Sequence, residues 1–214
     1  MSNKGSNKGS TREPAPKRVV LASDNAGKLA EFKALLGEWH CEVVPQSAFG
    51  TPECAETGDS FVENALLKAH AAAHHCRLPA IADDSGLEVD VLDGAPGIFS
   101  ARYAGPAASD TDNNHKLLAE LAGLGVAQRS ARFHCALVYL RHWQDPNPII
   151  CQANWEGVIL EQAVGENGFG YDPLFYVPEQ GCSSAQLPSA TKNRISHRGR
   201  ALRQLLAALR QEYS

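Results

Sequence analysis

The sequence lacks long apolar runs, an apolar N-terminal segment and paired cysteines. No stretch reaches about 18 consecutive apolar residues, which excludes a membrane-spanning helix, and we expect no membrane partner. The N-terminus has no apolar signal-peptide core, so we expect a cytoplasmic protein. The six cysteines include no Cys-x-x-Cys pair. A zinc ribbon or redox couple is therefore unsupported, and we expect buried free thiols.

The net charge of the chain is small, but its charged residues are unevenly distributed along the sequence. The formal net charge is −4, yet residues 1–18 carry a balance of +4, which leaves −8 for the rest. The segment from Lys192 to Arg210 is basic again and contains no acidic residue. An acidic body argues against a stable nucleic-acid partner, whereas a local basic cluster suits a small polyanion.

The chain divides into a polar tail and one long remainder. Residues 1–16 are rich in Ser, Asn, Lys and Gly and contain a direct Ser-Asn-Lys-Gly repeat, so we expect a disordered tail there. A chain of 214 residues with 43% apolar composition can bury one substantial core. We therefore expect a single domain over residues 17–214.

Hydrophobic periodicity in this remainder predicts an α/β fold with a mixed sheet. We expect helices over residues 26–36, 60–77, 109–121 and 196–212. We expect strands over residues 18–23, 41–45, 78–83, 87–90, 131–140, 149–160 and 174–177, with loops over residues 47–58 and 94–105.

Two adjacent carboxylates, Asp83 and Asp84, follow a short apolar segment and precede Ser85-Gly86. This order predicts a strand that ends at an Asp-Asp turn. Ionised aspartate is costly to bury unpaired, and a divalent metal would satisfy both charges while leaving a position for a reactive water. A solvated turn without a ligand is the alternative.

The segment Ser23–Lys28 lies where the first strand leads into the first helix. Free N–H groups and the helix dipole favour an anion there, and Lys28 in the first turn suits a phosphate better than it suits the dipole. The segment is not a P-loop, because Ala22 and Leu29 replace required residues. An ordinary Asn-capped helix with an exposed lysine is the alternative.

Three further segments suit a nucleotide. Lys68 shares a helix face with Asn64 and either points to an acidic site or lies in solvent over its apolar stem. Phe169, in a glycine-flanked turn, is suited to stacking on a base, or the turn holds core aromatics instead. His197 and Arg198 begin the last helix, where they can donate to an oxygen-rich ligand.

In combination these segments resemble the inosine triphosphate pyrophosphatase family, the Ham1-like non-canonical purine NTP pyrophosphatases. The resemblance covers residues 18–210 in order. It runs through Leu21–Lys28, Glu56-Thr57-Gly58, Phe61–Ala65, Ala82–Leu87, Gly94–Tyr103, Phe169–Pro173 and Ser196–Gly199. The resemblance implies an elongated mixed sheet flanked by helices, with two lobes and the nucleotide cleft between them. It also implies a homodimer and Mg²⁺-dependent hydrolysis of XTP, ITP and dITP to the monophosphate and pyrophosphate.

The resemblance further implies roles for individual residues. Asp84 is expected as proton acceptor and Lys68 as a second catalytic group that contacts the triphosphate. The expected Mg²⁺ ligands are Asp84, Glu56 and Asp83, with Ala55 standing where bacterial members commonly have another Glu. The expected triphosphate contacts are Ser23, Asp24, Asn25, Ala26, Gly27 and Lys28. The expected nucleoside and base contacts are Ser85, Phe169, Gly170, Tyr171, Asp172, Lys192, His197 and Arg198.

Selection of a 6-keto purine requires donors aimed at O6, which Arg198 or backbone N–H groups can supply. Two other classes fit part of the pattern. A nucleotide-sensing protein without catalysis would not need Asp83-Asp84. A Maf-type pyrophosphatase would share the α/β plan but lacks the Ser-His-Arg and Phe-Gly-Tyr-Asp blocks.

Overall fold

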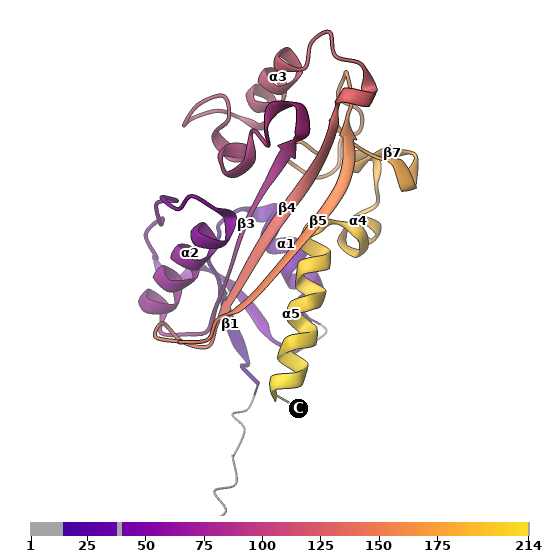
Figure 1. Cartoon of the computed structure of the whole chain (residues 1–214). Helices are drawn as coiled ribbons and strands as arrows, with labels where there is room; N and C mark the ends of the chain where they lie inside the picture. Colours follow the sequence, from indigo (N-terminus) through magenta and orange to yellow (C-terminus); the bar gives the residue numbers. More distant parts are fainter. Residues whose placement is uncertain (1–14, 38–39, 214) are drawn as a thin grey trace, which may run out of the picture.

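One seven-stranded mixed sheet runs the length of the molecule, with strand order β2-β1-β3-β4-β5-β6-β7. The computed structural model describes residues 15–37 and 40–213, so the expected tail lies almost wholly outside the described residues. Figure 1 shows β3, β4 and β5 as the long central strands. The strands are β1 Arg18–Leu21, β2 Glu42–Pro45, β3 Ala80–Val89, β4 Ser130–Leu140, β5 Ile149–Ile159, β6 Phe175–Val177 and β7 Cys182–Ser183.

Five α-helices flank this sheet in the described part of the chain. They are α1 Ala26–Leu36, α2 Phe61–Cys76, α3 Asp110–Glu120, α4 Ser189–Ile195 and α5 His197–Tyr213. The expected α/β class with a mixed sheet is confirmed, whereas α4 was not anticipated. The expected loop over 94–105 contains a 3-10 helix, Gly97–Arg102. Within the described ranges, no helix has the length and apolarity needed to cross a membrane.

Local sequence accounts for the starts of α1 and α2. The Asn25 side chain accepts a hydrogen bond from the Lys28 N–H at 2.9 Å, as expected of an Asn cap. The Ser60 hydroxyl likewise accepts from the Glu63 N–H at 3.2 Å. The Glu63 carboxylate, however, accepts from the Asp59 N–H rather than from Ser60, so the cap of α2 is not reciprocal.

The expected Asp-Asp turn between two strands is wrong. β3 continues without interruption through both residues and pairs with β4 throughout, with Asp83 opposite Leu137 and Asp84 opposite Ala136. Successive side chains of a strand point to opposite faces. The side chains of Asp83 and Asp84 therefore point to opposite faces of the sheet. Each carboxylate forms ion pairs with cations on its own face instead of lying in solvent.

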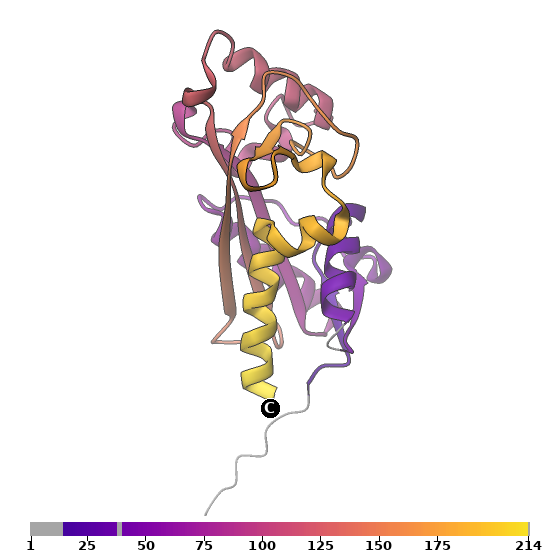
Figure 2. The ribbon, with the colours of Figure 1, turned by 90° about the vertical axis from the view of Figure 1, so that its right-hand side faces the viewer.

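The core lies on both faces of the sheet. On one face, β1 and β3 pack Leu21 and Ile81 against α1 and α5. Figure 2 shows the ribbon from the side of α5. On the other face, small residues such as Ala80 and Ala82 pack against α2. A third cluster, which includes Trp155, joins the far ends of the long strands to α3. Cys41, Cys135 and Cys151 are buried free thiols, as expected, and the other three cysteines are free and half-buried.

The connections around β1 create a crevice. From β1 the chain passes through α1 to β2 on one side, and later through α2 to β3 on the other. β1 pairs with β3 only as far as Ile81. Beyond Ile81, no strand of the described chain pairs with this edge of β3. The one β-bridge there among the described residues is isolated and joins Glu88 to Pro96. Ligands of open α/β sheets bind at such a switch point, beyond the carboxyl ends of the parallel strands.

Candidate active site

A cavity of about 160 Å³ lies beside this free edge of β3. It brings together segments from both ends of the chain, including the start of α1, the segment before α2 and the start of α5. Most of the residues expected at the site line it: Asn25, Lys28, Glu56, Asp84, Ser85, Phe169, Gly170, Tyr171, Asp172, Lys192, His197 and Arg198.

Ser23, Asp24, Ala26, Gly27, Lys68 and Asp83 are not among the lining residues. Asp24 points to the 3-10 helix Gln46–Phe49 and accepts from the Ser47 N–H at 3.0 Å. Gly27 lies under Phe169, since an added Cβ would be 2.7 Å from its ring. The expected contacts of these residues with a triphosphate or a metal stay predictions.

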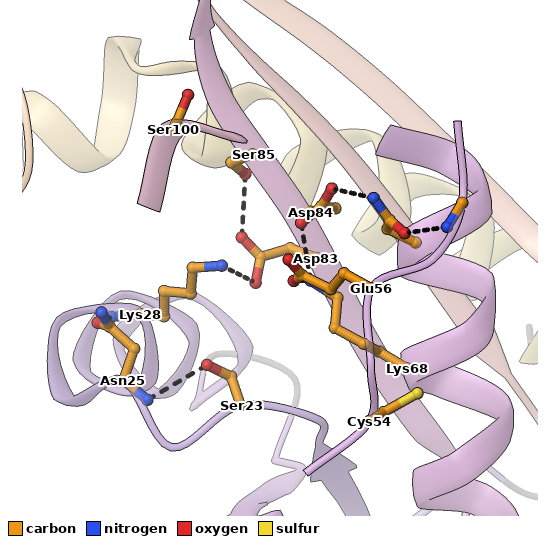
Figure 3. A network of polar contacts seen from close by, with 12 residues as sticks. Ser23, Asn25, Lys28, Cys54, Glu56, Lys68, Asp83, Asp84, Ser85 and Ser100 are labelled. Atoms are coloured by element: carbon orange, nitrogen blue, oxygen red, sulfur yellow. Dashed lines mark hydrogen bonds and ion pairs between the residues drawn. The ribbon is translucent and has the colours of Figure 1, made fainter. Parts of the chain in front are cut away.

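On the α2 face of β3, Lys68 joins two carboxylates (Figure 3). Its ammonium lies 2.8 Å from Asp84 Oδ1 and 2.8 Å from Glu56 Oε1. Only 12% of the Lys68 side chain is exposed, so it is not a lysine solvated over its stem. Burial disfavours its charge, but Asp84, Asp83 and Glu56 outweigh burial and raise the pKa of Lys68.

Asp84 and Glu56 respond differently to this environment. Burial raises the pKa of Asp84, and the nearby charge of Glu56 adds to the rise against the opposing effect of Lys68. Burial acts in the same direction on Glu56, but Lys68 and Arg102 outweigh it and lower the pKa of that carboxyl. Arg102 lies 2.8 Å from Glu56 Oε2. The site thus shifts the pKa values of these two carboxyls in opposite directions from their ordinary values.

Asp83, on the α1–α5 face, is held by cations. Arg198 Nε donates to it at 2.9 Å and the Lys28 ammonium lies 3.2 Å away. The Ser85 hydroxyl donates to it at 3.0 Å. Burial of this carboxyl is outweighed by Lys28, Arg198 and Lys68, so its pKa lies far below the usual range. Asp83 is an ionised counter-charge that orients Lys28 and Arg198.

The ion pairs continue from Arg198 to the glycine-flanked turn through Glu31, which the sequence analysis did not single out. Arg198 Nη1 lies 2.7 Å from Glu31. Glu31 is 3.6 Å from Lys192, whose ammonium lies 2.5 Å from Asp172. Charges therefore alternate in sign from Lys28 to Asp172. The available sequence signal was the spacing of Lys28 and Glu31, one turn apart on α1.

Asp172 holds the turn that presents Phe169. Its carboxylate accepts from the Phe169 N–H at 2.9 Å and from the Ser184 hydroxyl at 2.8 Å. Gly168 has a φ of 80° and no space for a Cβ, which would lie 2.0 Å from Asp172 Oδ2. The Lys192 ammonium lies 4.9 Å from the Phe169 ring centroid. Phe169 is thus a half-buried ring beside the cavity, whereas Tyr171 is a buried core aromatic.

His197 is a buried neutral ring beneath the cavity. It stacks on Phe133 with centroids 4.8 Å apart. Its Nδ1 has no hydrogen-bond partner among the described residues. Burial, Arg198 and Lys192 hold the pKa of His197 well below its ordinary value of 6.5.

We expect His197 to make the fold less stable in acid. Below about pH 6.5 the unfolded chain binds a proton at this residue that the folded chain does not, so the free energy of unfolding falls as pH falls. Between about pH 7 and pH 5 we expect a loss of up to about 2 kcal/mol, the full amount for a ring that stays neutral in the folded protein throughout this range. Urea unfolding of His197→Phe should show that much less pH dependence. His115→Phe, on the exposed face of α3, should match the wild type. An equal slope in His197→Phe and the wild type would contradict the assignment.

The carboxylates suit a hard divalent cation shared with a ligand. Among the described residues, no three His, Cys, Asp or Glu side chains are grouped closely enough to hold a metal by themselves. Glu56 and Asp84 nevertheless converge on one ammonium group and line the cavity. Mg²⁺ is usually held by one or two carboxylates together with substrate phosphates, rather than by an all-protein cage. The donor set therefore fits Mg²⁺.

The fold and the site together define an α/β protein with a charged ligand cleft at the switch point of its sheet. Residues 19–208 match the model of the Ham1 family. The chain belongs to the Ham1 family.

Relatives and solved structures agree with this assignment. The chain is 57% identical to a dITP/XTP pyrophosphatase of Vibrio vulnificus strain YJ016, over 92% of this chain and 98% of that protein. It is 58% identical to the protein of the same name from Vibrio parahaemolyticus, over 90% and 96% of the two chains. Its fold is similar to that of a HAM1 protein from Coxiella burnetii, with a TM-score of 0.84, 47% identity and coverage of 91% and 98%.

Proposed function

We propose that the protein hydrolyses the non-canonical purine nucleoside triphosphates XTP, ITP and dITP to the monophosphate and pyrophosphate. The names of its relatives, dITP/XTP pyrophosphatase, support the substrate class and the reaction. The observation that carries the proposal is that Asp83 and Asp84, adjacent on β3, pair with different cations, Asp83 with Arg198 and Asp84 with Lys68. Their pKa values are shifted in opposite directions on the two faces of one strand, at the edge of the cavity.

Asp84 is the proposed proton acceptor. Its raised pKa suits a general base, because a carboxylate that takes up a proton readily can remove one from an attacking water. Lys68 holds one oxygen of Asp84 and keeps the carboxylate oriented. Lys28 and the N-terminus of α1 would stabilise the charge that develops on the pyrophosphate leaving group. Asp83 would keep Lys28 and Arg198 in place rather than react.

Glu56 and Asp84 are the residues that would hold Mg²⁺. The bound ion would neutralise phosphate charge and favour the attacking water. Asp83 stays a predicted third ligand, although Lys28, Arg198 and Ser85 already surround its carboxylate. Glu56 is well suited to the role in spite of Ala55, since its side chain already lies opposite Asp84 across the Lys68 ammonium.

Phe169 and the two cations beside its ring, Lys192 and Arg198, form the proposed base site. The ring can stack on a purine, and Arg198, Lys192 or backbone N–H groups can donate to a 6-keto oxygen. Adenine carries an amino group at that position and would leave those donors unpaired in a buried site.

A homodimer, implied by the family resemblance, and a cytoplasmic location, expected from the lack of an apolar signal-peptide core, belong to the same proposal. Ile150 lies opposite Val138 in the sheet, so both side chains point to the α2 face, where Val138 is buried but Ile150 is 41% exposed. Leu67 on α2 is 40% exposed. A second copy would cover these residues, and sedimentation velocity distinguishes the dimer from a monomer.

A substrate panel with pyrophosphate detection tests the activity. We expect ITP, XTP and dITP to give pyrophosphate with kcat/KM at least about a hundredfold above ATP, since buried donors reject a base that cannot accept from them. Chelation of Mg²⁺ with EDTA should abolish turnover, and adding Mg²⁺ back should restore it. Orthophosphate in place of pyrophosphate would contradict the proposal. Binding of ITP without turnover would favour a nucleotide sensor.

A further inference from the structure

Asn64 is a buried polar residue to which the proposed function gives no role. It lies on α2 four residues before Lys68, so the two side chains leave the same face of the helix. Its exposure is 0%. A buried carboxamide costs free energy unless its donor and acceptor groups are paired, so its partners indicate why it is there.

The two ends of the Asn64 carboxamide bind two different parts of the site. Its oxygen accepts from the Gly58 N–H at 2.8 Å. Its nitrogen donates to Asp84 Oδ2 at 3.4 Å, while Lys68 donates to Asp84 Oδ1 at 2.8 Å. Neighbouring turns of α2 thus hold both oxygens of Asp84.

Gly58 belongs to the irregular segment that carries Glu56. Residues 51–58 have neither helix nor strand. At Gly58 the backbone lies so close to the start of α2 that a Cβ would be 2.6 Å from Glu63 Cβ and 2.9 Å from Asn64 Oδ1. Asn64 therefore links the backbone of this irregular segment directly to the carboxylate of Asp84.

We propose that Asn64 is a positioning residue that fixes the Glu56 segment relative to Asp84. It sets the separation of the two carboxylates that the proposed function assigns to a divalent cation, so the inference rests on that function. A cation binds both carboxylates at once, and partners that hold such groups in place contribute to affinity by limiting reorganisation. Asn64 acts through Glu56 and Asp84.

Hydrogen exchange tests this link without any turnover. Asn64→Ala removes the acceptor of the Gly58 N–H, so peptides that cover residues 52–60 should exchange faster than in the wild type. Asn64→Asp keeps an acceptor for that N–H but loses the donor to Asp84. Its exchange over residues 52–60 should stay close to that of the wild type.

Kinetics test the consequence for the site. In Asn64→Ala we expect the Mg²⁺ concentration for half-maximal turnover of ITP to rise about tenfold or more, and kcat to fall about ten- to a hundredfold. KM for ITP at saturating Mg²⁺ should change less than about threefold, because the proposed phosphate and base contacts are untouched. Asn64→Asp should also change the Mg²⁺ dependence in spite of its wild-type exchange, because a carboxylate oxygen replaces the donor to Asp84.

Asn113→Ala is the matched control for loss of a buried carboxamide. Asn113 lines another part of the cavity and also binds at both ends, accepting from the Ala104 N–H at 2.8 Å and donating to the Ala101 carbonyl at 3.2 Å. The Asn113→Ala variant should lower Tm about as much as Asn64→Ala does, but it should leave hydrogen exchange over residues 52–60 and the Mg²⁺ dependence of turnover unchanged. Gly58→Ala disturbs the same contact from the other side and replaces Asn64→Ala if that variant does not fold.

The outcomes separate the two proposals. Wild-type exchange over residues 52–60 together with wild-type Mg²⁺ dependence in Asn64→Ala would overturn the positioning role. Faster exchange without any change in Mg²⁺ dependence would also overturn it, since the link would then be structural only. If the wild type releases no pyrophosphate from ITP, XTP or dITP, the proposed function fails, and this role of Asn64 fails with it.

Discussion

Asp84→Asn should lower kcat for ITP by roughly 10²–10⁴-fold, the usual cost of removing a general base. The amide keeps the shape of the side chain but cannot accept the proton of an attacking water, and it removes one charge from the proposed Mg²⁺ site. Pyrophosphate release at saturating Mg²⁺ measures the effect. The free energy of unfolding should fall by about 1–3 kcal/mol, because the amide nitrogen replaces one of the two oxygens that accept from Lys68 and Asn64.

Asp90→Asn is the matched control for this variant. Asp90 directly follows β3, and its carboxylate is 44% exposed and paired with Arg132. This substitution makes the same chemical change a few residues away, and kcat should stay at the wild-type value. Turnover by Asp84→Asn within about tenfold of the wild type would remove Asp84 from the role of general base.

The sequence could not predict that β3 is one continuous strand, although it predicted strands over both halves of β3, residues 78–83 and 87–90. The letters Asp-Asp-Ser-Gly form turns when only local chemistry is considered. Their burial within a strand depends on cations from α1, α2 and α5, which are distant in the chain. Helix α4 was missed for a related reason: Ser189–Ile195 is too short to show a clear hydrophobic period.

The candidate site was predictable where residues sit in recognisable blocks and not where they act through partners. Lys28, Asp84 and Phe169 were identified by motif, and all three line the cavity. Glu31 and Asn64 lie on helices, where a charged or polar residue is usually solvated. Only the packing of α1 against α5 and of α2 against β3 reveals that Asn64 is buried and Glu31 half-buried beside the site.

Arg198→Ala should be the most destabilising of these substitutions. Arg198 and Asp83 are 2% and 1% exposed, and Glu31 shares the same guanidinium. Removal of one partner from a buried ion pair costs about 3–5 kcal/mol, because the remaining charges stay buried without compensation. We expect a loss of that size in the free energy of unfolding at neutral pH, measured by urea denaturation. The same loss makes this variant a poor test of base selection.

The pH dependence of this loss identifies its cause. The pKa of Asp83 is lower in the folded protein than its ordinary value of 3.8. Its ion pairs therefore contribute their full stabilisation above about pH 3.8, and this stabilisation is lost as pH falls through the folded-state pKa. In Arg198→Ala the carboxyl takes up a proton more readily, so the deficit should shrink toward about pH 4. Arg200→Ala, two residues along α5, removes a guanidinium that donates to the Asn154 carbonyl and should cost less than about 1 kcal/mol. A deficit independent of pH would mean that Arg198 stabilises the fold by packing rather than by neutralising Asp83.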